Sequence, residues 1–400
     1  MSEAIAVLYI LTIVRKNDEG TYQTNSIMFM AFEMLLPTLP LFVSHIGGDA
    51  SQVGLVTGVF MFSAILIRPF TASLAVKVHK KVLLLLGLAI CALMTGAYYL
   101  APNVGTILVI RVIHGLGFGL ATTYFATIVA EIIPKDRRGE GMGYFGVGET
   151  VAVSVGPLIG TSILVSFDFH GLFYGGMGIL FFALLMTVLV PRKFGGKANQ
   201  LEPASTSVKL FEKKVLIPSL LIMLTGVAAG SIMSFFALYA KDQGFDRVAW
   251  FFFVIAVGSF LVRLVSGKMY DRLGPAAVLI PASVVMMAGI LLITLSGSNL
   301  MFLLSGVLYG FGFGAIFPAL QTWCIDLVEE HEHEHAMAAF FNFFDLGIGG
   351  GSIILGLVAS AFSYQAVYYL AIAVMILFLL LCLSKLGKKD KDSSKIAGGG

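Results

Sequence analysis

Apolar residues follow one another along this chain in long blocks that short polar segments separate. The blocks cover residues 27–46, 52–75, 82–100, 105–133, 142–166, 171–190, 215–240, 249–266, 276–296, 300–327, 336–362 and 365–386. They are 18 to 29 residues long, and about 20 residues is the length at which an α-helix crosses about 30 Å of hydrocarbon. The strands of an outer-membrane barrel would instead alternate over about ten residues. The sequence therefore predicts an all-α membrane protein with twelve transmembrane helices.

The composition agrees with a lipid environment. Hydrophobic residues make up 58% of the chain and charged residues 12%, whereas water-soluble proteins carry about 25% charged residues. The net charge of +3 gives no indication of a nucleic-acid partner. The three cysteines lie inside apolar blocks without metal-ligand spacing, so we interpret them as packing residues.

Lysine and arginine are distributed unequally between the loops. One set of alternate loops holds Lys77, Lys80, Lys81, Lys135, Arg137, Arg138, Arg192, Lys193, Lys197, Lys209, Lys213, Lys214, Lys268 and Arg272. The other set holds only Lys241 and Arg247. Because short cytoplasmic loops collect basic residues, the first set is expected in the cytoplasm. This places the chain in the plasma membrane as a multi-pass protein with both termini cytoplasmic.

Polar segments divide the chain into parts. Residues 191–214 are rich in Gly, Pro, Ser and Lys and predict a cytoplasmic linker between a bundle at 27–190 and another at 215–386. Residues 387–400 form a basic tail. The atypical extension at 1–26 contains an apolar stretch too short to span a membrane, and we expect it to be an interfacial segment or an artefact of the start site.

The two halves repeat one another. The segment from His114 to Gly119 (HGLGFG) corresponds to the segment from Tyr309 to Gly314 (YGFGFG), an offset of 309 − 114 = 195 residues. Arg68 and Arg263 are separated by the same offset. The repeat predicts two pseudo-symmetric six-helix bundles, and such duplication places the substrate of a transporter near the bilayer midplane, between the repeats.

Several motifs resemble those of the major facilitator superfamily, and more narrowly its twelve-helix drug:proton antiporter branch of bacterial exporters. The resemblance covers about residues 27–386. The segments that carry it are MLLPTLP from Met34, ASLAVKVHKK from Ala72, RVIHGLGFG from Arg111, GETVAVSVGPLIG from Gly148 and GKMYDRLG from Gly267.

The resemblance implies roles for two groups of residues. Arg68, Arg263, Asp271 and Arg272 would belong to the cytoplasmic gate, and Asp271 can carry the family's acidic latch, whereas Val76 replaces that acid in the first copy. A helix bend typical of exporters would come from the antiporter motif, formed by Gly156, Pro157 and Gly160.

Four of the charged residues inside predicted helices are candidates for proton coupling: Glu33, Arg111, Glu149 and Asp345. A charge at that depth costs several kcal/mol unless it is paired or hydrated, so such residues are usually functional. Desolvation would favour the protonated form of Glu33, which suits a proton carrier. The alternatives are an electrostatic role for Glu33 and structural roles for the other two acids. The counter-charge of Arg111 would be Glu33 or Glu149.

Polar and aromatic side chains suited to an amphipathic solute lie in helices that form the cavity in the family. They are Tyr124, Gln321, Trp323 and Asn342.

The segment after the tenth block alternates Glu with His331, His333 and His335. Imidazole and carboxylate groups suit zinc, nickel or copper, and two of the histidines would lie one helical turn apart. We favour a solvated acidic loop, because metal sites normally take ligands from more than one segment.

Together these observations predict a proton-coupled secondary active exporter of a small amphipathic drug or metabolite that works by alternating access. Its partners would be the small-molecule substrate, protons and the lipid bilayer, and we expect a monomer without cofactors. An exporter of an opine-type metallophore, a proton-coupled nutrient importer and a non-transporting receptor or scaffold are the alternatives. The chain contains no nucleotide-binding loop or nucleophile–base set that would indicate an enzyme.

Overall fold

The structure of the chain is a computed structural model that describes residues 20–132, 138–189, 213–245, 247–329 and 333–397. Several predictions fall outside the described residues or side chains. These are the extension at 1–19, most of the linker 191–214, and the side chains of Val76, Glu149, His331, His333 and His335.

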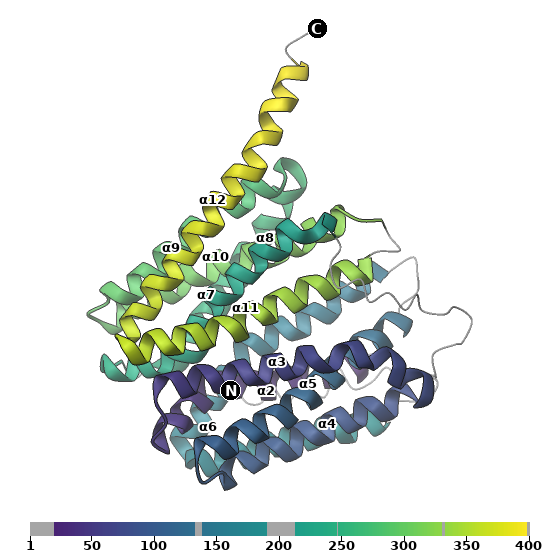
Figure 1. The fold of residues 1–400 in the computed structure, drawn as a ribbon, viewed down its shortest axis with the longest axis vertical. Helices are drawn as coiled ribbons and strands as arrows, with labels where there is room; N and C mark the ends of the chain where they lie inside the picture. Colours follow the sequence, from purple (N-terminus) through teal and green to yellow (C-terminus); the bar gives the residue numbers. More distant parts are fainter. Residues whose placement is uncertain (1–19, 133–137, 190–212, 246, 330–332, 398–400) are drawn as a thin grey trace, which may run out of the picture. The chain divides into compact units, whose positions relative to one another are not determined.

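Every regular element in the described residues is helical. The helices are α2 (Gly20–His45), α3 (Ala50–Lys77), α4 (Lys80–Ala97), η1 (Tyr98–Leu100), α5 (Val104–Ile132), α6 (Arg138–Leu189), η3 (Lys213–Val215), α7 (Leu216–Asp242), α8 (Val248–Leu273), α9 (Pro275–Leu295), α10 (Asn299–Asp326), α11 (His333–Ala361) and α12 (Tyr364–Ala397) (Figure 1). Eleven of them, within the described part of the chain, are long and apolar enough to cross a membrane. The prediction of an all-α membrane protein is confirmed.

The helix count differs from the twelve apolar blocks because α6 contains both the block 142–166 and the described part of the block 171–190. This helix has 52 residues and would be about 78 Å long if it were straight, more than twice the thickness of a bilayer core. Its backbone leaves the helical region at Phe167 and at Asp168, where φ is 54°. The helical geometry of α6 is therefore interrupted at these two residues.

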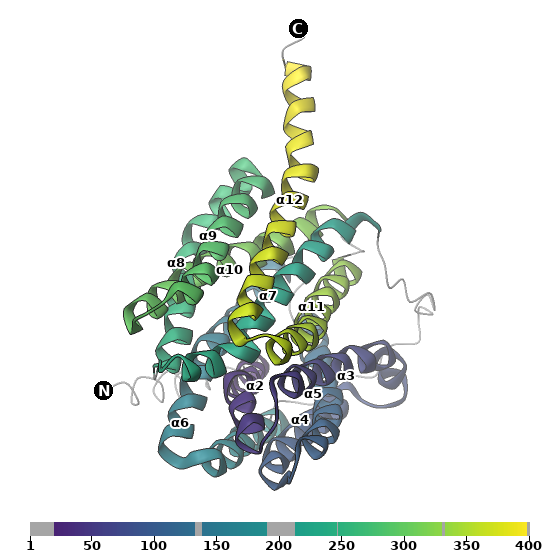
Figure 2. The ribbon, with the colours of Figure 1, turned by 60° about the vertical axis from the view of Figure 1, so that its left-hand side comes forward.

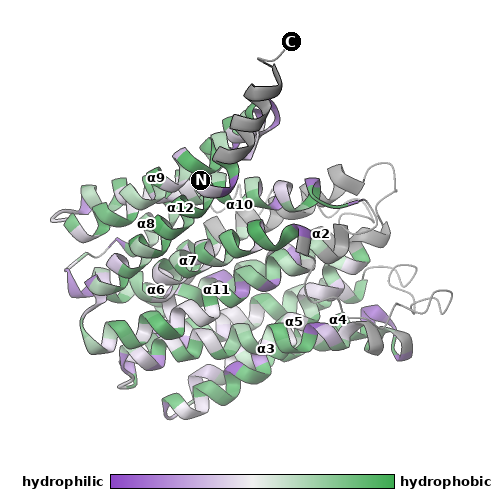
Figure 3. Cartoon of the chain, turned by 45° about the horizontal axis from the view of Figure 1, so that its top comes forward, coloured by the Kyte–Doolittle hydropathy of each residue, from purple (hydrophilic) through white to green (hydrophobic). Residues whose placement is uncertain are grey.

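Large apolar side chains are exposed on the flanks of the helices. Leu66, Val165 and Val265 expose 64%, 86% and 64% of their surface. Hydrophobic residues cover most of each helix, while hydrophilic residues gather near helix ends (Figure 3). Exposure on this scale is unfavourable in water, so these flanks face lipid.

Contacts divide the chain into two compact units. One contains the described residues of 1–38 and 63–206, and the other those of 39–62 and 207–400. In the first unit α4 packs against α5 and α6. In the second, α10 packs against α8 and α9, and α11 packs against α7 (Figures 1 and 2). The domain boundaries expected from the sequence stay predictions.

The repeat of 195 residues recurs in helix packing. A Cβ atom placed on Gly119 of α5 would lie 2.5 Å from the carbonyl oxygen of Ala64 in α3. In the second unit, a Cβ atom on Gly314 of α10 would lie 2.5 Å from the Cα of Ser259 in α8. Each residue of the second pair lies 195 positions after its counterpart. Equivalent helices therefore approach each other at equivalent glycines within each unit, which supports duplication.

Candidate functional site

Arg111 lies two turns into α5 and is buried in the first unit, with 2% of its surface exposed. Its Nη1 atom donates a hydrogen bond to the Tyr98 hydroxyl oxygen at 3.4 Å, and its guanidinium carbon lies 5.7 Å from the centre of the Tyr98 ring. The same hydroxyl lies 2.8 Å from Nδ1 of His114. Arg111, Tyr98 and His114 thus form one buried polar chain.

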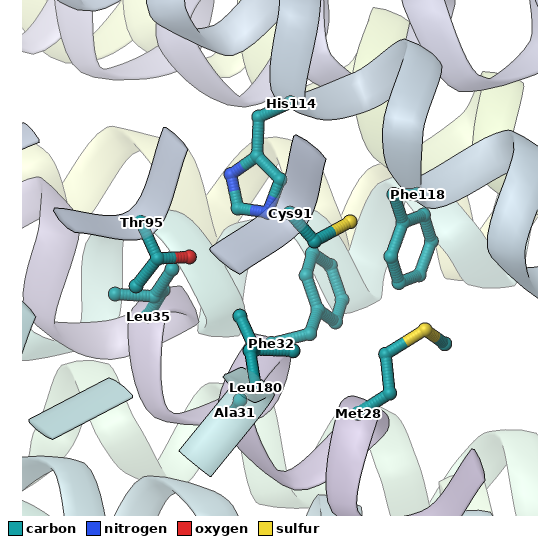
Figure 4. A pocket seen from close by; sticks show the side chains of 9 residues that line it. All are labelled: Met28, Ala31, Phe32, Leu35, Cys91, Thr95, His114, Phe118 and Leu180. Carbon is teal, nitrogen blue, oxygen red and sulfur yellow. The ribbon is translucent and has the colours of Figure 1, made fainter. Parts of the chain in front are cut away.

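Side chains from four helices surround His114. Figure 4 shows the residues that line the narrow space beside it: Met28, Ala31, Phe32 and Leu35 of α2, Cys91 and Thr95 of α4, Phe118 of α5 and Leu180 of α6. The space is too small to hold a water molecule. Phe173 of α6 packs on the Tyr98 ring at a centroid distance of 5.6 Å. The polar chain is therefore enclosed by packed side chains.

Glu33 and the antiporter motif lie together in the same unit. Glu33 on α2 is 6% exposed, and a Cβ atom on Gly156 of α6 would lie 2.5 Å from its Cβ. One turn further along α6, a Cβ atom on Gly160 would lie 2.6 Å from the carbonyl oxygen of Met34. Larger residues at these two glycines would push α6 away from α2. The motif residues thus set how closely α6 approaches the buried carboxylate.

The Tyr124 hydroxyl is hydrogen-bonded within the protein. Its hydroxyl donates to the backbone carbonyl of Thr71 at 2.7 Å and its side chain is 2% exposed, so it joins α5 to α3. The other predicted cavity residues belong to the second unit. Gln321 and Trp323 on α10 and Asn342 on α11 are half-buried.

The remaining charged candidates differ in burial. Asp345 on α11, Arg68 on α3 and Arg263 on α8 are half-buried. Asp271 and Arg272, near the end of α8, are exposed. Beside them, the buried Tyr270 donates a hydrogen bond from its hydroxyl to Asp326 of α10 at 2.7 Å. This link between α8 and α10 was not predicted.

A second group that the sequence did not indicate is a cluster of buried hydroxyls in the second unit. Ser234 of α7 donates to the Thr57 Oγ1 atom of α3 at 3.1 Å, and its Oγ lies 3.1 Å from that of Ser352 on α11. Small polar residues spread over three distant segments carry no local signal. Tyr98 was missed for the same reason, whereas His114 lies inside the recognised motif.

No metal site is formed by the described residues, among which no three His, Cys, Asp or Glu side chains are placed to hold a metal ion. The three histidines proposed as ligands lie outside the described side chains.

Long apolar helices that bury an arginine and a carboxylate are typical of polytopic membrane transporters. The sequence profile of the Major Facilitator Superfamily matches residues 24–348 and 219–399. The chain belongs to this family, and it is therefore a transporter of small molecules and not an enzyme. The predicted family is confirmed.

Relatives of the chain have names that refer to multidrug resistance or efflux. It is 29% identical over 373 residues to the multidrug resistance protein MdtG of Enterobacter lignolyticus, covering 87% of this chain and 86% of the relative. It is 28% identical over 371 residues to the multi-drug resistance efflux pump PmrA of Streptococcus pneumoniae, covering 88% and 92%.

Solved structures share the fold at low sequence identity. The crystal structure of the nucleoside transporter NupG matches with a TM-score of 0.73 and 16% identity, covering 92% of this chain and 98% of that chain. A bacterial homologue of the human lysosomal transporter Spinster matches with a TM-score of 0.74 and 16% identity, covering 92% and 95%. These similarities show the fold alone.

Proposed function

We propose that the protein is a proton-coupled exporter of a small amphipathic molecule, a drug or a metabolite, in the plasma membrane. The observation that carries this proposal is the close packing of buried Glu33 against Gly156 of the antiporter motif. A carboxylate in a desolvated position can exchange a proton, and a helix that approaches it through glycines can move relative to it without a side-chain barrier. The name of the relative PmrA, an efflux pump, favours export over import, and the name of MdtG, a multidrug resistance protein, agrees with a drug as substrate.

The transport cycle in this proposal is alternating access between two six-helix bundles at 27–190 and 215–386. It requires twelve spans, of which α6 supplies two, separated at Phe167 and Asp168. An even number of spans agrees with both termini lying on the cytoplasmic side, as the loop charges predict. Arg111, Glu149 and Asp345 are the further candidates for proton coupling.

The experiment that tests the proposal uses everted membrane vesicles with an acidic lumen. Dyes, antibiotics and metal-chelating metabolites are added singly, and the loss of the proton gradient is recorded. We expect specific compounds to dissipate the gradient, because an exporter moves them inward in exchange for protons. Arg111→Ala removes a hydrogen bond made by a charged group and should slow this response at least about tenfold. Glu33→Gln removes the carboxyl group that exchanges the proton in this proposal and should slow the response at least as much.

Matched controls separate coupling from general damage. Arg247→Ala and Glu329→Gln remove the same charges at exposed positions and should leave the response unchanged. An importer that moves solute and proton in the same direction would not dissipate the proton gradient when solute is added outside everted vesicles. Export would be contradicted if no compound dissipated the proton gradient and solute accumulated in right-side-out vesicles.

The metallophore alternative rests on the segment with His331, His333 and His335. A response confined to metal-chelating metabolites would favour it over drug export.

A further inference from the structure

The chain of Arg111, Tyr98 and His114 has one hydrogen-bond direction in which the Tyr98 hydroxyl both accepts and donates. A guanidinium only donates, so Tyr98 receives the hydrogen bond from Arg111 Nη1 on its oxygen. The O–H of Tyr98 can then be donated to His114 Nδ1, 2.8 Å away. An imidazole that accepts at Nδ1 is neutral and carries its proton on Nε2. The direction runs from Arg111 through Tyr98 to His114.

The surroundings bury the chain among mostly apolar side chains. The described neighbours of His114 include the Tyr98 hydroxyl on η1, the Cys91 side chain of α4 and, through its charge, Arg111 on α5. Helices α2 and α6 present apolar groups such as Phe32 and Leu180 (Figure 4). Because the enclosed space is too small for a water molecule, breaking one link would leave a buried polar atom unsatisfied, which is unfavourable.

The second copy of the repeat packs the equivalent pair of helices without such a polar chain. At the offset of 195 residues, Tyr98 corresponds to Ile293, Arg111 to Gly306 and His114 to Tyr309. Ile293 and Tyr309 are buried in the second unit, 0% and 3% exposed. An apolar residue and a glycine thus fill the positions of Tyr98 and Arg111 in a helix pair of the same kind. The polar chain is a property of the first copy alone.

We propose that Tyr98 and His114 are positioning residues that hold the Arg111 side chain in its working orientation in the proton-coupling site. His114 accepts the O–H of Tyr98, which turns the lone pairs of the tyrosine oxygen toward Arg111. Removing either group allows the guanidinium to take other orientations. This inference rests on the proposed function, since it assigns the chain to a site whose task is proton-coupled transport.

The test compares Tyr98→Phe, His114→Leu and His114→Gln in the everted-vesicle assay, with each rate divided by the amount of protein in the membrane. Tyr98→Phe keeps the ring that packs on Phe173 and removes only the hydroxyl. We expect Tyr98→Phe and His114→Leu each to lower the maximal rate about tenfold. The half-saturating compound concentration should change less than about twofold, because the enclosed chain does not touch the solute.

His114→Gln tests whether another hydrogen-bond acceptor can replace the imidazole and preserve the transport rate. Its amide oxygen can still accept from Tyr98, so this variant should keep most of the unmodified rate. Tyr99→Phe and His170→Gln are the matched controls. Tyr99 and His170 pack on each other at an exposed position, at a centroid distance of 5.0 Å, and both controls should behave as the unmodified protein. An unmodified rate in Tyr98→Phe, or a His114→Gln variant as slow as His114→Leu, would overturn the proposal.

A second measurement does not depend on transport. The thermal unfolding of the purified protein is followed for Tyr98→Phe, His114→Leu and the double variant. Coupled residues should give a double variant that unfolds at the temperature of the less stable single variant, whereas additive shifts would overturn the coupling. If the unmodified protein moves no protons with any compound, the proposed function has failed, and this cycle still decides whether Tyr98 and His114 act together.

Discussion

Hydroxyl groups inside the apolar helices often donate a hydrogen bond to a backbone carbonyl of the same helix. Thr38 donates to the carbonyl of Met34 at 2.6 Å, and Thr187 donates to that of Ala183 at 2.8 Å. Tyr124 donates to Thr71 in the neighbouring helix. The polar residues of a span therefore do not reveal which of them face a solute. The role predicted for Tyr124 in the substrate cavity stays a prediction, and the geometry gives it a packing role as well.

Asp49 caps the N-terminus of α3 and supports a prediction about acid stability. Its Oδ1 accepts from the Ser51 hydroxyl at 2.6 Å and from the Gln52 N–H at 2.8 Å, while Gln52 Oε1 accepts from the Asp49 N–H at 3.1 Å. The hydrogen bond from the Ser51 side chain, followed by that from the Gln52 backbone, lowers the pKa of Asp49. Asp49→Ala should lower the free energy of unfolding by about 1 kcal/mol at neutral pH.

The sign of the pH effect follows from the lowered pKa. The charged cap stabilises the fold above the ordinary pKa of an aspartate, about 3.9, and this contribution is lost as the pH falls through the lower value of the folded state. Thermal unfolding in detergent should therefore separate Asp49→Ala from the unmodified protein at pH 7 and less so near pH 3. Asp49→Asn, which keeps a neutral cap, should show little of this pH dependence. An equal deficit for Asp49→Ala at both pH values would contradict the assignment.

At the scale of elements, the packing of α3 on α11 depends on the absence of side chains. A Cβ atom on Gly54 would overlap the backbone carbonyl of Ser352 and lie 3.1 Å from the Cα of Gly356. Backbone atoms cannot move aside as a flexible side chain can. Gly54→Ala should therefore cost about 1–3 kcal/mol of stability.

The measurement is thermal unfolding in detergent, with Gly178→Ala as the control. Gly178 lies in α6, where an added Cβ atom would meet nothing within 4 Å. This control should be neutral or up to about 1 kcal/mol more stable, because alanine favours a helix over glycine. Equal effects of both substitutions would mean that α3 and α11 can separate at no cost.

The sequence indicated the helices well but not their neighbours. Hydropathy alone located the spans, because each apolar block must cover the bilayer by itself. It could not show that Gly156 lies against Glu33, since both residues were recognised but belong to segments more than 100 residues apart. Nor could it find Tyr98, whose partners come from the next helix. Contacts between helices depend on rotation and register, which hydropathy does not define.

At the scale of the whole molecule, the loop charges predict which side of the membrane each loop faces. Pro102, between α4 and α5, is exposed and expected outside the cell, whereas Lys77 at the end of α3 is exposed and expected in the cytoplasm. The three native cysteines are buried and should not react. Pro102→Cys should therefore be labelled by a membrane-impermeant maleimide in intact cells, and Lys77→Cys only in everted vesicles. The reverse labelling pattern would show that the predicted orientation in the membrane is wrong.

Lys81 has one expected role during membrane insertion and another in the folded structure. In the predicted topology Lys81 belongs to the basic cytoplasmic loops, whose charge orients the helices during insertion. In the finished structure the side chain is 8% exposed, and its Nζ donates to the carbonyl of Val188 in the last turn of α6 at 2.9 Å. The side chain whose charge is expected to orient the helices thus also joins α4 to α6 in the folded protein. Replacing Lys81 by a neutral residue would remove both contributions. The orientation of the inserted protein would report the first, and the stability of correctly inserted protein would report the second.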